Sequence, residues 1–386
     1  MVPPELEPLR ARRELGAGTG DSSRSPEPIK RVLIVCDWHL KYSAALATAL
    51  LRAGTDVAFL CRTHSREFGD SQEELHGLLA SVKESGAELF LLPGRISSLR
   101  SLPGLVRTFR QVRRWRPRVV HAQENSDPRL LAVTRGYPLV VTVHDPARHP
   151  GEPTIRQAEE AIWRWWLRAA DRVVVHGEQL RELVPRFVAR ERIRVIPHGT
   201  EPHAEPDPPP IDRTVLFYGR LAKYKGLGVL LDAMEIVWRQ RPDVRLLVYG
   251  RGPEAQLLPD DPRIEASIGY LPEAMEDAMF ARASVVVLPY ISGTQSGVGA
   301  RSLARGIPTV VTEVGSLPEL ALDDSFLVPP RDSEQLAKAL IAHLDHGIEV
   351  RRSVLRFARS TFSWDAVSSS SLALYEEVLN EASDHR

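Results

Sequence analysis

Short apolar runs alternate with amphipathic stretches along most of the chain. Between residues 31 and 197 these runs are nearly continuous and rich in valine, leucine and isoleucine, which is typical of a parallel sheet covered by helices on both faces. Amphipathic helices are predicted at 43–54, 101–117 and 155–170. Strands are expected at RVLIVCD (31–37), TDVAFLC (55–61), AELFLL (87–92), RVVHAQ (118–123), LVVTVHD (139–145), RVVVHG (172–177) and RIRVIP (192–197). This part of the chain therefore predicts one doubly wound α/β domain.

The alternation restarts after a proline-dense segment, HGTEPHAEPDPPPIDR (198–213). Proline at this density prevents a helix or an inner strand, so this segment is predicted to contain a stiff linker. Strands are then expected at TVLFYG (214–219), VRLLVYG (244–250), RIEASIG (263–269), SVVVLP (284–289), PTVVTE (308–313) and, weakly, SFLVP (325–329). Helices are expected at 226–242, 271–283, from about 298, at 333–347 and at 363–382. The second half predicts another domain of the same class.

Together these patterns predict an α/β protein with two doubly wound, Rossmann-like domains that face each other across a cleft. The expected boundaries are 30–200 for the N-terminal domain, 201–213 for the linker, 214–362 for the C-terminal domain, and 363–386 for a helix that crosses back to the N-terminal domain. Residues 1–29 lack the apolar segment of a secretory signal and are predicted to be a disordered tail. Ligands of such sheets bind beyond the carboxyl ends of the strands, so the cleft is the expected site.

Composition narrows the functional classes. Of the 386 residues 26% are charged and the formal net charge is zero, so no global field favours nucleic acid. No apolar run reaches the roughly 18 residues of a membrane span. Cys36 and Cys61 lie in strand-like runs and are expected to be reduced core thiols of a cytoplasmic protein. The basic, amphipathic segment 100–118 favours a cover helix on the sheet, with peripheral contact to an anionic membrane as the alternative.

The loop FYGRLAKYKG (217–226) carries candidate phosphate ligands. Gly219 permits a tight turn at the end of a strand, and Arg220 and Lys225 flank the start of the next predicted helix. Two cations beside the free N–H groups of a helix N-terminus suit a diphosphate. A solvated loop with two surface cations remains the alternative.

Two further glycine-containing loops follow strands of the second half. In LPYISGTQSGVG (288–299), the amides of Gln295, Ser296 and Gly297 could receive phosphate oxygens, or Ser296 could simply cap the helix. Gly250 begins a lone G-x-G. The full G-x-G-x-x-G pattern is missing here and after the first strand, which argues against a dinucleotide-binding oxidoreductase.

A polar pair, His144 and Asp145, ends an apolar strand and precedes a loop rich in proline and glycine. A substrate contact and a structural histidine fit this position equally well. His121, His176 and His198 also end strands, but the four histidines lack the close spacing of metal ligands, so no metal site is predicted. The tryptophans of IWRWWLRAA (162–170) favour packing over an acceptor platform.

Several stretches, taken in order, resemble glycosyltransferase family 4, whose members have the two-domain GT-B fold. They are RVIPHGTE (194–201), GRLAKYKG (219–226), VRLLVYGRGPE (244–254), SVVVLPY (284–290), GIPTVVTEVGSLPEL (306–320) and FSWDAV (362–367). RPRVVHAQ (116–123) and VVTVHD (140–145) look like N-domain strands of that family. The set covers nearly the whole chain after the tail.

The resemblance implies a retaining, metal-independent transfer of a sugar from a nucleotide-sugar donor to an unknown acceptor hydroxyl, with no cofactor besides that co-substrate. It implies that Arg220 and Lys225 contact the donor diphosphate and that His144 lies near the transferred sugar. The departing phosphate would take the proton, which agrees with the lack of a convincing carboxylate pair. The donor-binding positions that it implies are Gly219, Gly250, Ile268, Tyr270, Gln295, Ser296, Gly297, Arg301 and Glu319.

The chain departs from the family pattern in two places. Gly293 and Arg301 stand where the family often carries the glutamates of E-x7-E, and the second of these normally binds the ribose. Lys41-Tyr42-Ser43 replaces the glycine-rich loop of the N-terminal domain. These departures keep a second hypothesis open, a non-catalytic sugar-nucleotide-binding or partner subunit. A GT-B sugar-nucleotide epimerase is a third hypothesis, which the order of the motifs disfavours.

Overall fold

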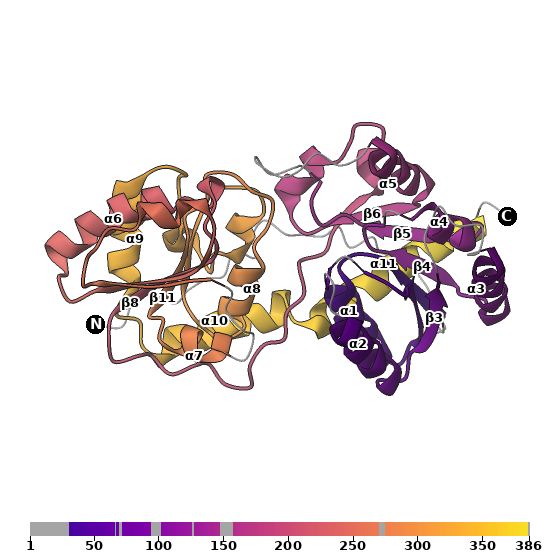
Figure 1. Cartoon of the computed structure of the whole chain (residues 1–386), viewed down its shortest axis with the longest axis horizontal. Helices are drawn as coiled ribbons and strands as arrows, with labels where there is room; N and C mark the ends of the chain where they lie inside the picture. Colours follow the sequence, from indigo (N-terminus) through magenta and orange to yellow (C-terminus); the bar gives the residue numbers. More distant parts are fainter. Residues whose placement is uncertain are drawn as a thin grey trace, which may run out of the picture.

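The computed structural model describes residues 31–65, 67–68, 72–93, 102–125, 127–146, 157–269 and 275–384. These residues form two α/β domains that lie next to each other, each built on a parallel sheet (Figure 1). The predicted pair of doubly wound domains is therefore confirmed. The predicted disordered tail, residues 1–29, lies outside the described residues.

The N-terminal sheet has the strand order β3-β2-β1-β4-β5-β6-β7, and all neighbours pair in parallel. Its strands are β1 (Arg31–Cys36), β2 (Asp56–Arg62), β3 (Glu88–Leu92), β4 (Val119–Ala122), β5 (Leu139–Thr142), β6 (Arg172–Val175) and β7 (Ile193–Val195). Its helices are α1 (Leu40–Arg52), α2 (Gln72–Glu84), α3 (Leu102–Trp115), α4 (Pro128–Thr134) and α5 (Gln157–Ala169).

The burial of β1 explains why the strands of this half read as continuous apolar runs. Val32 and Ile34 belong to one hydrophobic cluster, with α1 and α2, whereas Leu33 and Val35 belong to a second cluster on the other face. Successive side chains of a strand point to opposite faces. Because helices cover both faces, every position must be apolar.

The C-terminal sheet has the order β10-β9-β8-β11-β12-β13. Its strands are β8 (Thr214–Arg220), β9 (Arg245–Arg251), β10 (Ile264–Ile268), β11 (Val285–Leu288), β12 (Thr309–Thr312) and β13 (Leu327–Val328). Its helices are α6 (Leu227–Gln240), α7 (Glu276–Ala281), α8 (Gly297–Leu303), α9 (Ser333–His343) and α10 (Ile348–Thr361). One hydrophobic cluster joins this sheet to its helices.

The last helix, α11 (Trp364–Asp384), leaves the C-terminal domain and lies against α1 of the N-terminal domain (Figure 1). Trp364 and Tyr375 are buried in the cluster formed by β1, α1 and α2, and the Tyr375 hydroxyl lies 2.6 Å from Nδ1 of His121. Thr200, on the outward crossing, forms a parallel bridge with Ser363, on the return. The two connections between the domains therefore lie side by side.

The proline-dense segment 201–213 has no regular secondary structure and runs along the surface of the C-terminal domain. The backbone N–H of His203 donates to Ala304 (2.8 Å), and that of Asp207 donates to Arg305 (2.9 Å). Several residues of the segment are proline and cannot donate, so it makes few main-chain hydrogen bonds. The segment thus lies along the C-terminal domain, close to the crossing.

Candidate active site

Each sheet has one place where its strand order reverses, between β1 and β4 in the N-terminal sheet and between β8 and β11 in the C-terminal sheet. Loops beyond the carboxyl ends of such strands run in opposite directions and leave a crevice, the usual ligand site of open α/β sheets. Residues 37–39 and 123–125 border the first crevice, and residues 219–226 and 289–296 border the second. The candidate phosphate ligands lie at the second.

The two domains touch directly near these edges. The Thr294 hydroxyl donates to the Asp145 carboxylate, and the backbone N–H of Glu178 donates to Glu319 (2.5 Å). A Cβ added to Gly177 would lie 2.2 Å from that of Ser316. The space left between the domains here, beside His176, is about 10 Å³, roughly the room of one water molecule. A sugar donor does not fit into this pocket in the domain arrangement of the structure.

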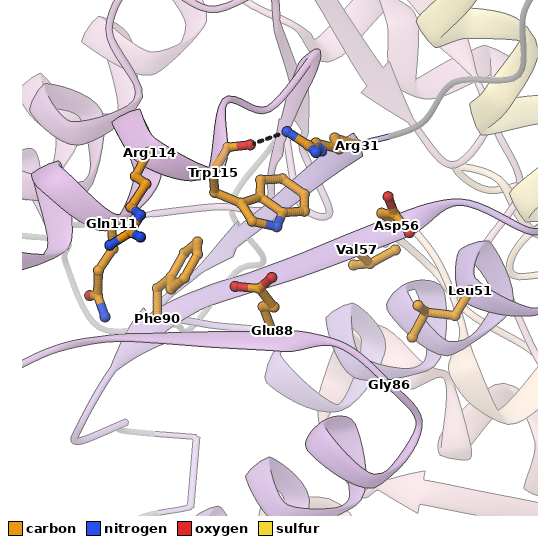
Figure 2. A pocket seen from close by; sticks show the side chains of 10 residues that line it. All are labelled: Arg31, Leu51, Asp56, Val57, Gly86, Glu88, Phe90, Gln111, Arg114 and Trp115. Atoms are coloured by element: carbon orange, nitrogen blue, oxygen red, sulfur yellow. Dashed lines mark hydrogen bonds between the residues drawn. The ribbon is translucent and has the colours of Figure 1, made fainter.

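A larger pocket, of about 510 Å³, lies elsewhere (Figure 2). It is lined by the first residues of three strands, Arg31, Asp56 and Glu88, and by Trp115, whose carbonyl accepts a hydrogen bond from Arg31 (2.9 Å). These residues lie at the amino ends of β1, β2 and β3, the edge opposite to that at which α/β sheets bind their ligands. None of the predicted site residues lines it.

Lys225 occupies the crevice of the C-terminal domain at the end of a 3-10 turn (Lys223–Lys225). Its Nζ lies 3.8 Å from the ring centroid of Tyr290 and 5.1 Å from that of Tyr224. Burial lowers the pKa of Lys225 to about 8, and the nearby charge of Arg220 lowers it further. Within the described part of the chain no carboxylate forms an ion pair with this ammonium group. Asp145 is near enough for its charge to act on Lys225, but it does not form an ion pair with it. This partly buried cation is therefore suited to an anionic ligand.

Glycines allow the Lys225 loop to lie this close to its neighbours. Gly226 has φ 74°, and a Cβ there would lie 1.9 Å from the carbonyl oxygen of Pro289. Gly250 faces Gly219 across β8 and β9, and a Cβ at Gly250 would lie 1.8 Å from the Gly219 carbonyl oxygen. The close pairing of β8 and β9 therefore explains why residue 250 must be glycine. At Gly219 a Cβ would meet no atom closer than 3.8 Å, but the φ of 128° favours glycine there.

The expected amide cradle at 295–297 comes directly before α8. Ser296 caps this helix, because its Oγ accepts a hydrogen bond from Gly299 N (3.4 Å), and the same Oγ lies 2.8 Å from the Tyr290 hydroxyl. A Cβ on Gly297 would meet no described atom within 4 Å. Gln295 has a buried Oε1 without a hydrogen-bond partner among the described residues. Ser296 therefore serves as the N-cap of α8, which was the alternative to phosphate binding. The space around Gly297 is open.

Arg301, in α8, is joined to a carboxylate that no sequence motif indicated. Its Nη1 lies 2.7 and 2.6 Å from the two carboxylate oxygens of Glu276, at the start of α7. The Tyr218 hydroxyl donates to the same carboxylate (2.6 Å). Burial, followed by Glu276, raises the pKa of Tyr218 to about 12. The charge at position 301 is therefore balanced by an acid from another helix.

His144 is fully buried, and both of its ring nitrogens have partners. Nδ1 of His176 lies 2.9 Å from the carbonyl oxygen of Ile196 and must donate to it, so Nε2 of His176 accepts from Nδ1 of His144 (3.0 Å). Nε2 of His144 then needs a donor. Gln123 lies 3.0 Å away and its side-chain nitrogen is otherwise unpartnered, so this amide satisfies both groups when its nitrogen faces the ring. Burial, with the neighbouring His39, holds the pKa of His144 well below its usual value.

An aromatic cluster surrounds His144. The His39 ring stacks on it with a centroid distance of 3.8 Å, and Tyr42 meets it edge-on at 4.8 Å. Burial lowers the pKa of His176 to about 3 and that of His198 to about 4, so both are neutral at physiological pH. The strand-end histidines meet because the carboxyl ends of parallel strands share one edge of the sheet.

Several predicted site residues do not lie in the structural element that the sequence predicted, or lie outside the described residues. Lys41, Tyr42 and Ser43 lie in the first turn of α1 and form no loop. The loop before α1 consists of 37–39. Ile268 ends β10 with 51% of its surface exposed, and Tyr270 lies outside the described residues.

The tryptophans of 162–170 divide between packing and solvent. The side chain of Trp166, on α5, is buried in the core of the N-terminal domain, and Trp163 packs against the same hydrophobic cluster. Both agree with the prediction that these tryptophans serve packing. Trp165 is 53% exposed. Another exposed tryptophan, Trp38, belongs to no sequence motif. It follows β1 at the cleft edge and is 41% exposed.

The described residues were also compared with what a metal site and a membrane-spanning helix require. Although histidines gather in the cleft, the described residues hold no group of three or more His, Cys, Asp or Glu side chains arranged for a metal ion. Among those residues, too, no helix has both the length and the apolar character that crossing a membrane requires. Helix α3 does expose Leu102, Val106 and Phe109 in one stripe.

The sequence matches two family models in the order of the two domains. A model described as Glycosyltransferase Family 4 matches residues 41–203, and one described as Glycosyl transferases group 1 matches residues 212–346. The chain is 29% identical to the phosphatidyl-myo-inositol mannosyltransferase of Mycobacterium leprae, over 71% of this chain and 78% of that protein. It is 26% identical to the glycogen synthase of Mycobacterium tuberculosis, over 86% of this chain and 88% of that protein.

Solved structures share the fold. The sucrose-phosphate synthase of Thermosynechococcus elongatus has a TM-score of 0.62 at 18% identity, covering 91% of this chain and 100% of that chain. HepE of Anabaena, in complex with UDP and glucose, has a TM-score of 0.62 at 14% identity, covering 89% of this chain and 99% of that chain. These likenesses show a GT-B arrangement of two Rossmann-like domains.

Proposed function

Because the chain belongs to glycosyltransferase family 4 and is a glycosyltransferase, we propose that it transfers a hexose from a nucleotide-sugar donor to an acceptor hydroxyl, with retention of configuration and without a metal ion. The C-terminal domain holds the donor nucleotide, and the N-terminal domain holds the acceptor. Relatives described as mannosyltransferase and glycogen synthase, and a fold neighbour described with UDP and glucose, support this class of donor.

Lys225 carries the proposal. Its ammonium group lies in a largely buried position at the crevice between β8 and β11, and burial lowers its pKa to about 8. The described residues supply it with tyrosine rings but with no ion-paired carboxylate. A diphosphate would supply the missing counter-charge, and Arg220, whose charge acts on Lys225, would share it.

In the reaction, the bond between the anomeric carbon and the β-phosphate oxygen breaks, and its electron pair leaves with the diphosphate. Arg220 and Lys225 stabilise the charge that develops there, aided by the amides near Gly297. The acceptor oxygen bonds to the anomeric carbon on the face that the phosphate leaves, and its proton passes to the departing phosphate. No protein nucleophile takes part. His144 lies beneath the sugar site, and its buried ring with two hydrogen-bond partners supports the shape of that site.

The test is a thermal-shift screen of nucleoside diphosphates and their sugars, because a ligand of the folded state raises its apparent stability. We expect one nucleotide to be preferred. Lys225→Met should raise the melting temperature without ligand, since it removes an uncompensated buried charge, and should reduce the ligand-induced shift. Lys223→Met is the matched control, because Lys223 is an exposed lysine of the same turn. Turnover should fall on the order of 10²-fold in Lys225→Met and in Arg220→Ala.

Two outcomes would contradict the proposal. Equal ligand shifts in the two methionine variants would remove Lys225 from the donor site. No shift with any nucleotide, in a protein that is folded, would favour the non-catalytic subunit of the same fold.

The proposal has two further parts. The free, buried thiols of Cys36 and Cys61 are neighbours across β1 and β2 yet form no disulfide, which supports a reducing, cytoplasmic location. Helix α3 supports peripheral contact with an anionic membrane, because its exposed apolar stripe is flanked by arginines and the helix contains no acidic residue.

A further inference from the structure

The crevice of the N-terminal domain is bordered by three side chains that the donor site does not use. Trp38 and His39 follow β1, and Glu124 follows β4, so they stand on the two sides of the point where the strand order reverses. This is the place in an open α/β sheet where a ligand is expected. His144, by contrast, is fully buried with both ring nitrogens bonded, and its side chain is not open to a ligand.

His39 is held in an unusual and well-supported position. Its backbone is left-handed, with φ 58° and ψ 41°, which is uncommon for a residue other than glycine and is found more often at functional sites. Its ring stacks on His144 at 3.8 Å, and its Nε2 lies 3.3 Å from the Glu124 carboxylate. Nδ1 has no hydrogen-bond partner among the described residues. With Nε2–H donating to Glu124, this nitrogen is an acceptor for a hydroxyl proton.

Trp38 adds an apolar surface beside this acceptor. It is 41% exposed, and its ring is edge-on to that of His39, with centroids 6.3 Å apart and planes at 88°. The two rings thus present one flat apolar face and one hydrogen-bonding group at a right angle. A pyranose ring has the matching chemistry, a C–H face for the indole and hydroxyls at its rim for the imidazole.

The local charge disfavours a phosphate at this crevice. The N-terminus of α1, which could otherwise bind an anion, is already occupied by the Glu67 carboxylate, which accepts from Leu40 N at 2.5 Å and from Lys41 N at 3.4 Å. Glu124 and Asp145 add negative charge nearby, since each acts on the histidines of the cluster. The crevice is therefore suited to a neutral, hydroxyl-rich ligand.

We propose that Trp38 and His39, with Glu124 orienting the imidazole, form the acceptor subsite and that this subsite takes a neutral pyranose ring. Trp38 stacks on the ring and His39 accepts a hydrogen bond from one of its hydroxyls. Glu124 acts only through His39 and is a positioning residue. The acceptor is thus a carbohydrate, an inference that rests on the transferase function proposed above.

Saturation-transfer NMR tests the subsite with methyl α-mannopyranoside and maltotriose as probes and glycerol as the hydroxyl compound without a ring. The protein is saturated with the nucleoside diphosphate selected by the thermal-shift screen. We expect saturation of the pyranose ring protons and none for glycerol. Trp38→Ala should weaken the affinity for the sugars about tenfold, the scale of one aromatic contact, and Trp38→Phe should weaken it less. Trp165→Ala is the matched control, since it removes an exposed tryptophan of α5.

The imidazole is tested separately. His39→Asn keeps a residue that tolerates the left-handed backbone but removes the ring, so the sugar affinity should fall while the fold persists. Glu124→Ala should raise the KM for the sugar acceptor more than it changes kcat, and Glu124→Gln should recover part of this loss because its amide oxygen still accepts from Nε2–H.

The two proposals fail differently. If no nucleotide binds the folded wild-type protein, the transferase function fails. If the nucleotide binds the wild type and Trp38→Ala equally, but the sugars give no saturation in the wild type or bind Trp38→Ala and Trp165→Ala alike, the subsite is wrong. Sugar binding to His39→Asn as tight as to the wild type would remove His39 from it.

Discussion

Restoring a glutamate at position 301, where the family often carries one, should damage this protein unless Glu276 is changed as well. In the native chain the Arg301 guanidinium lies 2.6 Å from the Glu276 carboxylate, whose side chain is only 10% exposed. Two unit charges whose centres lie about 4 Å apart attract each other by about 4 kcal/mol at an effective dielectric constant of 20. Because 40% of the Arg301 side chain is exposed, solvent screening and the cost of desolvation reduce the net value to about 2 kcal/mol.

Arg301→Glu replaces this attraction with repulsion between two carboxylates. We expect a loss of about 4 kcal/mol in the free energy of unfolding, twice that of Arg301→Gln, since repulsion is added to the lost attraction. At 2–4 °C per kcal/mol for a domain of this size, the melting temperature should fall by about 8–16 °C in Arg301→Glu and about half as much in Arg301→Gln. Glu276→Gln combined with Arg301→Glu removes the repulsion and should recover most of the difference.

Calorimetry of the four proteins between pH 5 and pH 8 measures this effect. Two adjacent carboxylates raise the pKa of one of them in the folded state, so the folded protein binds more protons than the unfolded chain. The stability of Arg301→Glu should therefore fall as pH rises, whereas the double variant should show a weaker dependence. An Arg301→Glu protein that melts with the wild type at pH 8 would falsify the assigned pairing, as would a double variant no more stable than the single one.

Two shorter predictions concern the donor site and the surface. Burial lowers the pKa of Lys225 to about 8, so its ammonium form predominates below that pH. Affinity for the diphosphate product should therefore weaken as pH rises through 8 in calorimetric titrations, and a flat profile up to pH 9.5 would argue against contact. If α3 contacts membranes, the protein should sediment with phosphatidylglycerol vesicles at low salt and less at about 0.5 M salt, because each arginine near an anionic surface contributes about 1 kcal/mol. Val106→Glu with Phe109→Glu should abolish sedimentation, Trp165→Glu should not, and equal sedimentation of both variants would refute a role for the stripe of α3.

The strands of both sheets could be predicted from the sequence because a strand that is buried on both faces is a continuous run of apolar residues. β1 must be apolar at every position, since Leu33 and Ile34 face different cores, and such a run is visible without a structure. The pattern did not predict α10. Its buried face is narrow and includes the charged side chain of Arg351 beside Val354, Leu355 and Ala358.

Some residues of the candidate site could be predicted from the sequence, and others could not. Lys225 could be singled out because its loop has a local motif, although its contact with a diphosphate stays a prediction. The meeting of the strand-end histidines follows from parallel strands that end at one edge. The partner of Arg301 could not be found, because Glu276 lies on another helix and no spacing rule joins them. His39 was missed because its signal is a left-handed backbone, which the residue type does not announce.

The return of α11 to the N-terminal domain has a consequence for how the protein is made. A ribosome synthesises the N-terminal sheet first, but Trp364 and Tyr375, which fill its core, emerge only after the strands of the C-terminal domain. The C-terminal domain has all of its strands and its helices up to α10 by residue 361. Although domains generally fold in the order of synthesis, the first domain here is completed last. His121 therefore gains its contact with the hydroxyl of Tyr375 only after the second domain has been made. A nascent chain stalled before residue 364 would carry a complete C-terminal domain and an incomplete N-terminal core.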